Sequence, residues 1–153
     1  MIIHKKSADI EPSHKNVHED YEYFKRDFVP RGTANGCVVS IYEIPPKKSA
    51  YPYHYHLKNE ETFYIISGKG ILKTPDGDKN VEAGDFLFFP ADEGGAHKLT
   101  NTSDTESLVY IDFDTAHDVD LTVYPDSGKI GVWGKDVNKV FRRDENVDYY
   151  DGE

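Results

Sequence analysis

The chain has 153 residues, which is enough for one domain with a sizeable hydrophobic core. Its formal net charge of −10 disfavours nucleic acid and anionic membrane surfaces as partners, because both require a clustered positive field. No apolar stretch approaches the roughly 20 residues of a membrane span, and residues 1–6 lack the apolar segment of a leader, so we expect a cytoplasmic protein. Cys37 is the single cysteine, which excludes an intramolecular disulfide and a thiolate cluster.

Three segments follow one another along the chain. Residues 1–36 are polar and mixed, and they predict an N-terminal extension with a short helix over 18–24. Residues 37–113 consist of short apolar or alternating runs between turn residues, which predicts an all-β antiparallel sandwich or barrel. No helix long enough for a parallel crossover separates these runs. Residues 114–153 predict a C-terminal extension that packs on the barrel. The expected strands are 37–44, 50–56, 62–67, 69–74, 80–82, 86–89, 97–101 and 108–113.

Alternation within the runs predicts which side chains face the interior. Residues two apart on a strand share a face, whereas a register error of one residue exchanges the two faces. The expected interior side chains are Phe63, Ile65, Phe86, Phe88 and Leu99.

The strongest functional signal is the pair His54 and His56. If they lie on a strand, both imidazoles face the same side. Glu61 opens the following expected strand, across a hairpin closed by residues 57–60, and His97 begins a later one. Three imidazoles and a carboxylate form a ligand set for a divalent transition metal such as zinc, iron, manganese or nickel. Four protein ligands would leave open positions on a six-coordinate ion for water or substrate.

Each of these residues also has a simpler interpretation. His54 and His56 can lie on a solvated strand face between outward tyrosines, as histidines in a His-x-His pattern commonly do. A glutamate such as Glu61 more often faces solvent than a metal, and a histidine such as His97 is more often a polar loop residue. The metal hypothesis therefore depends on the spacing of the surrounding residues.

That spacing resembles the cupin family. His54-x-His56-x4-Glu61-x6-Gly68 is similar to the first cupin motif, and Gly84-x5-Pro90 followed by His97-x3-Asn101 is similar to the second. The resemblance covers about residues 37–113. It implies a double-stranded β-helix, a jelly-roll-like barrel, with a metal at His54, His56, Glu61 and His97.

Two positions depart from the cupin pattern. Lys48 stands where the first motif usually has a glycine, and two extra residues precede His97, where Gly94 and Gly95 can form a wider turn. The chain also resembles small single-domain bacterial cupins that carry a Tyr-Pro-Asp segment after the barrel, here residues 124–126. That subgroup has no agreed reaction, so the resemblance implies no substrate.

Several functions fit this reading. The first is a cupin with a His3Glu metal centre that acts on a small polar metabolite, sugar-like or keto-acid-like, as a metal-dependent isomerase or dioxygenase. The second is a non-catalytic domain that binds or senses a small molecule. The third is an empty barrel whose histidines hydrogen-bond one another. No residue can be assigned as catalytic; the candidates by sequence proximity alone are Tyr51, Tyr53, Tyr64, Lys98 and Asn101.

Association is also expected. The two flanks are long for so small a barrel, and both contain apolar residues such as Phe28 and Trp133. Sheet edges require protection as well. We therefore expect a homodimer in which a flank covers or extends the sheet of a neighbouring chain, the alternative being flanks that fold back on their own barrel.

Overall fold

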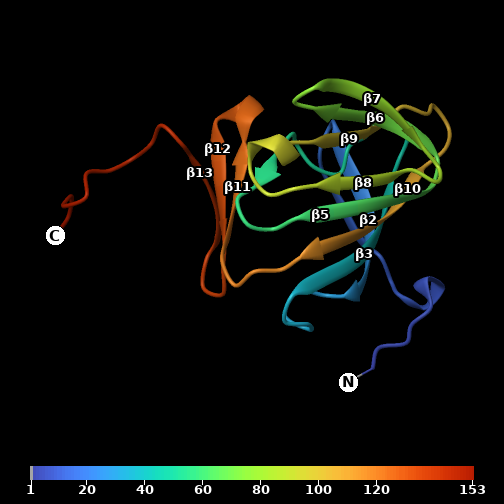
Figure 1. Cartoon of the computed structure of the whole chain (residues 1–153), viewed down its shortest axis with the longest axis horizontal. Helices are drawn as coiled ribbons and strands as arrows, with labels where there is room; N and C mark the ends of the chain where they lie inside the picture. Colours follow the sequence, from blue (N-terminus) through green and yellow to red (C-terminus); the bar gives the residue numbers. More distant parts are fainter. Residues whose placement is uncertain (1) are drawn as a thin grey trace.

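The computed structural model describes residues 2–153, and its secondary structure is almost entirely β (Figure 1). The described residues form no α-helix, only short 3-10 turns at η1 (Ser7–Asp9), η2 (Glu93–Gly95) and η3 (Pro125–Ser127). The predicted all-β class is therefore confirmed. In chain order the strands are β1 (Ser13–His18), β2 (Tyr21–Val29), β3 (Cys37–Ile44), β4 (Tyr55–His56), β5 (Glu61–Ser67), β6 (Lys69–Thr74), β7 (Gly77–Glu82), β8 (Phe86–Phe89), β9 (Lys98–Asn101), β10 (Leu108–Thr115), β11 (Asp120–Tyr124), β12 (Lys129–Trp133) and β13 (Asn138–Arg142).

The strands form three antiparallel sheets. The largest has the order β1-β2-β3-β10-β5-β8, the second β13-β12-β11-β4 and the third β7-β6-β9. Strands distant in sequence are neighbours: β10 lies between β3 and β5. Such long-range pairing is what a jelly-roll-like barrel requires, and it brings the segments that carry the histidines to one end of the barrel.

The core lies on the inner face of the six-stranded sheet. Inward residues alternate with outward ones, as in β3, where Ser40, Tyr42 and Ile44 are buried. The rings of Tyr42 and Tyr110 stack on neighbouring strands with centroids 5.2 Å apart. Burial of such rings and aliphatic side chains is the main source of stability in a domain of this kind. The predicted interior positions Phe63, Ile65 and Leu99 are confirmed as buried.

The predicted interior positions Phe86 and Phe88 are wrong, because their side chains are 66% and 52% exposed. In the β5–β8 pairing Phe63 lies opposite Leu87, and opposed residues share a face. Leu87 and Phe89 therefore face the core, so the apolar run of β8 was placed one residue out of register.

The helix predicted over 18–24 is also wrong. That segment contains the turn between β1 and β2, and β2 extends the large sheet by pairing with β3. Tyr23 points inward and is buried, with Glu22 and Phe24 on the other face, which is the period of a strand. Residues after 114 form β11–β13 and pair with β4. The division at residues 36 and 113 into separate units stays a prediction.

Within residues 2–153 no helix is long and apolar enough to cross a membrane.

Candidate metal centre

Two of the predicted site residues are held together by their backbones. The N–H of His54 donates to the carbonyl of His97 at 3.1 Å, and the N–H of His97 donates to the carbonyl of His54 at 2.9 Å. The widened segment before His97 contains η2 and is tied to β4 by the bond from the Asp92 N–H to the His56 carbonyl. The two extra residues are thus absorbed in the turn, and His97 lies directly opposite His54.

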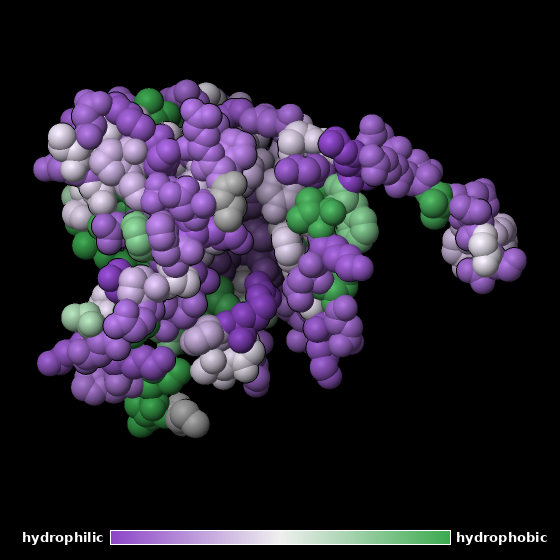
Figure 2. Space-filling model, turned by 180° about the vertical axis from the view of Figure 1, so that it is seen from behind, coloured by the Kyte–Doolittle hydropathy of each residue, from purple (hydrophilic) through white to green (hydrophobic). Residues whose placement is uncertain are grey.

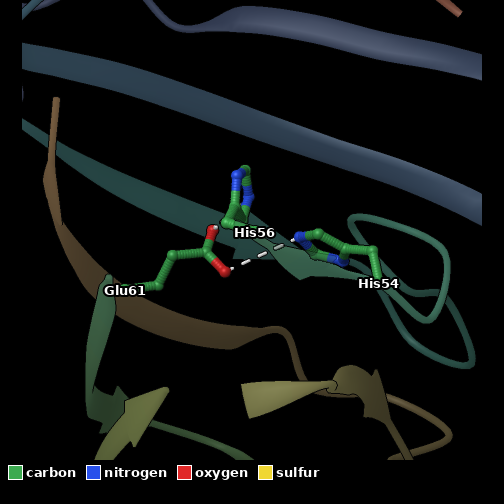
Figure 3. Close-up of side chains that lie close together, drawn as sticks. All are labelled: His54, His56 and Glu61. Atoms are coloured by element: carbon green, nitrogen blue, oxygen red, sulfur yellow. Dashed lines mark ion pairs between the residues drawn. The ribbon is translucent and has the colours of Figure 1, made fainter. Parts of the chain in front are cut away.

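His56 and Glu61 come from strands that do not pair with each other. His56 ends β4, which pairs with β11, and Glu61 begins β5, which pairs with β10 and β8. The predicted hairpin through residues 57–60 is therefore wrong: this segment crosses from one sheet to another. The crossing turns the Glu61 carboxylate back toward the histidines (Figure 3).

The three imidazoles converge on one carboxylate. The Nε2 atoms of His54, His56 and His97 lie 3.6, 3.5 and 3.2 Å from the nearer oxygen of Glu61. His54, His56 and Glu61 each offer a ligand atom, and these atoms all lie within 4.8 Å of one another. His54, His56 and Glu61 thus form a group that could hold a metal ion, and His97 lies against Glu61 outside that group; the role of all four as metal ligands stays a prediction.

The other ring nitrogen of each histidine is already engaged. The Nδ1 atom of His54 lies 2.8 Å from the carbonyl oxygen of Pro52, and that of His97 lies 2.9 Å from the carbonyl oxygen of Gly95. Because a carbonyl only accepts, both Nδ1 atoms carry a proton, which leaves Nε2 as the nitrogen of each ring that can ligate a metal. His97 Nε2 is buried and makes no hydrogen bond. A cation among these acceptors would satisfy all of them, so this donor set fits a divalent metal.

Asp120 holds the third histidine and was missed by the sequence reasoning. Its carboxylate accepts a hydrogen bond from His56 Nδ1 and further bonds from the N–H groups of Lys58 and Asn59. Burial alone would raise the pKa of Asp120, but these hydrogen bonds lower it below its usual value, so the carboxylate stays an anion. A carboxylate behind a ligating histidine fixes the ring and raises its basicity. Asp120 lies in the C-terminal sheet, outside the part of the chain that resembles the cupin motifs.

Protonation differs among the histidines. Burial lowers the pKa of His97 to about 4, so its ring is neutral near pH 7. Burial would also lower the pKa of His56, but its bonds with Asp120 and Glu61 prevail and raise it to about 10. Burial would raise the pKa of Glu61, yet the surrounding histidines hold it well below its usual range. In the absence of metal, the His56 proton is therefore the cation in this cluster.

A cavity of about 270 Å³ opens beside this cluster. Its walls come from the inner face of the large sheet and from the C-terminal sheet, which contributes Thr122, Tyr124 and Trp133. Figure 2 shows the molecular surface hollowed between the C-terminal strands and the body of the barrel. Trp133 donates its indole N–H to Thr122 Oγ1 at 2.7 Å, and this hydroxyl lies 3.1 Å from His56 Nδ1. The C-terminal residues thus build one wall of the pocket.

Asp112 and Asp114 line the same cavity and are the second feature that the sequence reasoning missed. One oxygen of each carboxyl, Oδ1, is buried without a hydrogen-bond partner. Burial and the neighbouring Asp114 raise the pKa of Asp112 well above its usual range, while burial and Glu61 raise that of Asp114 to about 7. The signal was present in the sequence: two acids with a single residue between them in an apolar strand, the same spacing as His54 and His56.

The five acid–base candidates chosen by sequence proximity differ in whether they reach the cavity. Only Tyr51 lines the cavity, and its hydroxyl bonds those of Tyr42 and Tyr23. Tyr64 is on the outer face and 46% exposed. Asn101 is structural, since its side-chain amide donates to the carbonyls of Ile44 and Glu106. Tyr53 and Lys98 form cation–π contacts with Lys73 and Tyr21 and lie outside this cavity.

The fold and the cluster together define a class of protein: antiparallel β-barrels with three histidines and a glutamate gathered at one end as a candidate metal site. Comparison with known families assigns the family within that class. The sequence profile of the Cupin domain matches residues 40–114. The chain belongs to the cupin superfamily.

Three individual proteins are similar to the chain. An uncharacterized protein of Aquifex aeolicus is 36% identical over 93 residues, which cover 61% of this chain and 69% of that protein. An oxalate-binding protein of Thermotoga maritima is 33% identical over 64 residues, 42% of this chain and 50% of that protein. The crystal structure of a candidate sugar phosphate isomerase from Acidithiobacillus ferrooxidans superposes with a TM-score of 0.80 at 25% identity, covering 92% of this chain and 90% of that one.

Proposed function

We propose that this cupin binds one divalent transition metal through His54, His56, Glu61 and His97, and that it isomerises a small polar metabolite of sugar or keto-acid type at that site. The observation that carries the proposal is the set of three Nε2 atoms directed at the Glu61 carboxylate. Lone pairs gathered in a buried place repel one another unless a proton or a metal ion lies between them, and His97 Nε2 has neither a donor nor solvent beside it.

Each residue around the proposed ion has a defined task. The carbonyls of Pro52 and Gly95 and the carboxylate of Asp120 hold the three rings in the tautomer that leaves Nε2 free. Phe89 stacks on His97, with ring centroids 3.6 Å apart, and fixes the plane of that ring. When bound, the metal would act as a Lewis acid that polarises a carbonyl or hydroxyl of the ligand. The pocket walls would orient the ligand and exclude water around it.

The likeness to the Acidithiobacillus structure favours isomerase chemistry over dioxygenation. The Acidithiobacillus protein is described as a candidate sugar phosphate isomerase and matches over 92% of this chain. The cavity of about 270 Å³ lies slightly below the usual range for small-molecule pockets, which suits a compact metabolite.

A non-catalytic binding role is the second candidate. It is favoured by the oxalate-binding protein of Thermotoga maritima, which is 33% identical to this chain over 64 residues. Turnover distinguishes the two. Metal-loaded protein should be tested against sugars, sugar phosphates, keto acids and diketones, with oxalate as a binding control. Isomerisation of any of them supports the enzyme, whereas binding without turnover of a bound ligand supports the sensor.

Metal content is the direct test of the proposed centre. Protein purified without added metal should contain about one divalent ion per chain; its identity is open among zinc, iron, manganese and nickel. Because the pKa of His56 is about 10, the ion must displace that proton at neutral pH. The affinity should therefore rise about tenfold per pH unit between pH 7 and 9. Metal analysis and calorimetry in buffers of different ionisation enthalpy measure both; no bound metal at any pH contradicts the proposal.

We also propose that the chain forms a homodimer. The expected contact was a flank on a neighbouring chain's sheet; because β2 pairs with β3 and β11 pairs with β4 of the same chain, we propose the outer face of the large sheet instead. Tyr64, Ile66, Phe86, Phe88 and Phe113 lie on β5, β8 and β10, and each is between 46% and 66% exposed. Apolar side chains exposed together on one face of a sheet commonly mark an interface. An uncharged patch also lets two chains of net charge −10 meet without like charges in contact. Light scattering at tens of micromolar should give twice the mass of 17.4 kDa, and a monomer mass contradicts the dimer.

A further inference from the structure

The carboxyls of Asp112 and Asp114 have no role in holding the histidines. They lie two residues apart on β10, so both face the cavity. Across the neighbouring strand β5, Asp112 is opposite Phe63 and Asp114 is opposite Glu61. The pair therefore lies on the pocket wall directly beside the proposed ion.

The surroundings do not satisfy these two acids. Asp112 is only 6% exposed, and Oδ1 of each carboxyl is buried with no partner among the described residues. An unpaired buried oxygen costs about 1–3 kcal/mol, which a protein rarely retains without a use. Asp27, in the same row of the inner face, is different: it accepts a bond from Ser40 at 2.7 Å and pairs with Lys25 at 2.9 Å. Among the buried carboxyls of residues 2–153, the two with an oxygen that lacks a partner are Asp112 and Asp114, beside the proposed ion.

Two adjoining carboxyls suit a particular chemistry. Their oxygens accept hydrogen bonds side by side, which matches two neighbouring hydroxyl groups on a ligand. An amine would also be attracted to acids, but Lys25 and Arg31 line the same pocket and repel a cation. The rings of Tyr42, Tyr51 and Tyr110 provide apolar faces of the kind that cover the C–H side of a sugar.

We propose that Asp112 and Asp114 together bind neighbouring hydroxyl groups of a polyhydroxylated ligand, a sugar or sugar phosphate, beside the proposed metal ion. This inference deepens the proposed function and rests on it. It assigns the carboxyl pair the selection of ligands that carry hydroxyls over small anions that do not. The two acids are thus specificity residues of the pocket.

Binding of defined probes to the metal-loaded protein tests the pair. Ribose 5-phosphate and ribose are the polyhydroxylated probes, and oxalate is an anion without hydroxyls. Asp112→Asn and Asp114→Asn keep the shape of the side chains but change their charge and hydrogen bonding. Each variant should weaken the binding of both sugars by about tenfold or more, a loss of about 1.4 kcal/mol or more. Oxalate affinity should stay the same or increase. Asp27→Asn is the matched control and should change neither.

Metal affinity is measured on the same variants, which separates the two proposals. If the metal binds the wild type but neither sugar does, the ligand class is wrong and the metal site stands. If sugars bind equally to the wild type and to both variants, the pair is not part of recognition. An equal loss of sugar and oxalate binding in the variants shows that the acids only maintain the pocket and also overturns the inference. If the variants bind ribose 5-phosphate more weakly than the wild type does, and ribose binds to none of these proteins, the ligand is a phosphorylated sugar.

Discussion

Replacing His56 with alanine is expected to lower the affinity for a divalent metal by at least about 100-fold, and with it any metal-dependent activity, while the barrel stays folded. The lower bound follows from the partners behind ligating histidines, whose loss alone typically costs 10–100-fold. The barrel should survive because its stability comes from buried apolar faces, at about 25 cal/mol per Å². Competition with a chromophoric chelator measures the affinity, and urea unfolding of the metal-free protein measures the fold.

Two further variants are compared with His56→Ala, one with a smaller expected loss of metal affinity and one as a control. Asp120→Asn removes the charge behind His56 but leaves the ring in place, so its loss of affinity should be smaller than that of His56→Ala. His14→Ala removes an exposed histidine that pairs with Glu22 on the surface, and should leave metal binding unchanged. Wild-type turnover in His56→Ala would show that the chemistry lies elsewhere. Failure of that variant to fold beside a stable metal-free wild type would favour the empty barrel.

Local patterns in the sequence were enough to predict the strand class and the pair His54 and His56. His54 and His56 are one residue apart, and alternate residues of a strand share a face whatever the topology. Glu61 and His97 could be added only through the resemblance to cupin motifs, since nothing local indicates that β5 and the segment before β9 meet at β4.

The surroundings of the histidines could not be predicted for the same reason. Asp120 reaches His56 across 64 residues, through a pairing of β4 with β11 that leaves no periodic signal in the sequence. Four residues, 125–128, connect β11 to β12, whereas the sequence predicted only an extension that packs on the barrel, with no strands of its own. Partners of this kind depend on tertiary pairing, which local propensity does not encode.

The error at β8 has a different origin. Phe86, Leu87, Phe88 and Phe89 are all apolar, so alternation gives no phase and either pair of alternate residues could face inward. The structure places two phenylalanines outside because the opposite strand sets the register. An apolar run of this sort on an edge strand is itself informative, since one of its faces packs on the core and the other leaves Phe86 and Phe88 exposed.

Gly95→Ala is expected to destabilise the protein by about 1–3 kcal/mol, the range seen when extra atoms are forced into a packed site. A Cβ at this buried position would lie 1.8 Å from the carbonyl oxygen of Pro90, so backbone must move. The carbonyl of Gly95 also accepts the bond that fixes His97 Nδ1. Movement of this turn should therefore reorient the His97 ring and weaken metal binding about tenfold or more, as for other partners behind metal ligands.

The neighbouring Gly94→Ala is the matched control, because nothing lies within 4 Å of its Cβ position. Its free energy of unfolding should change by less than about 0.5 kcal/mol, as for surface substitutions in general. Urea unfolding of the metal-free proteins and chelator competition of the loaded ones give both quantities. Equal behaviour of the two alanine variants would show that the widened turn tolerates movement and that the position of His97 does not depend on Gly95. A stability loss in Gly95→Ala without any loss of metal affinity would instead show that this turn does not set the geometry of the proposed centre.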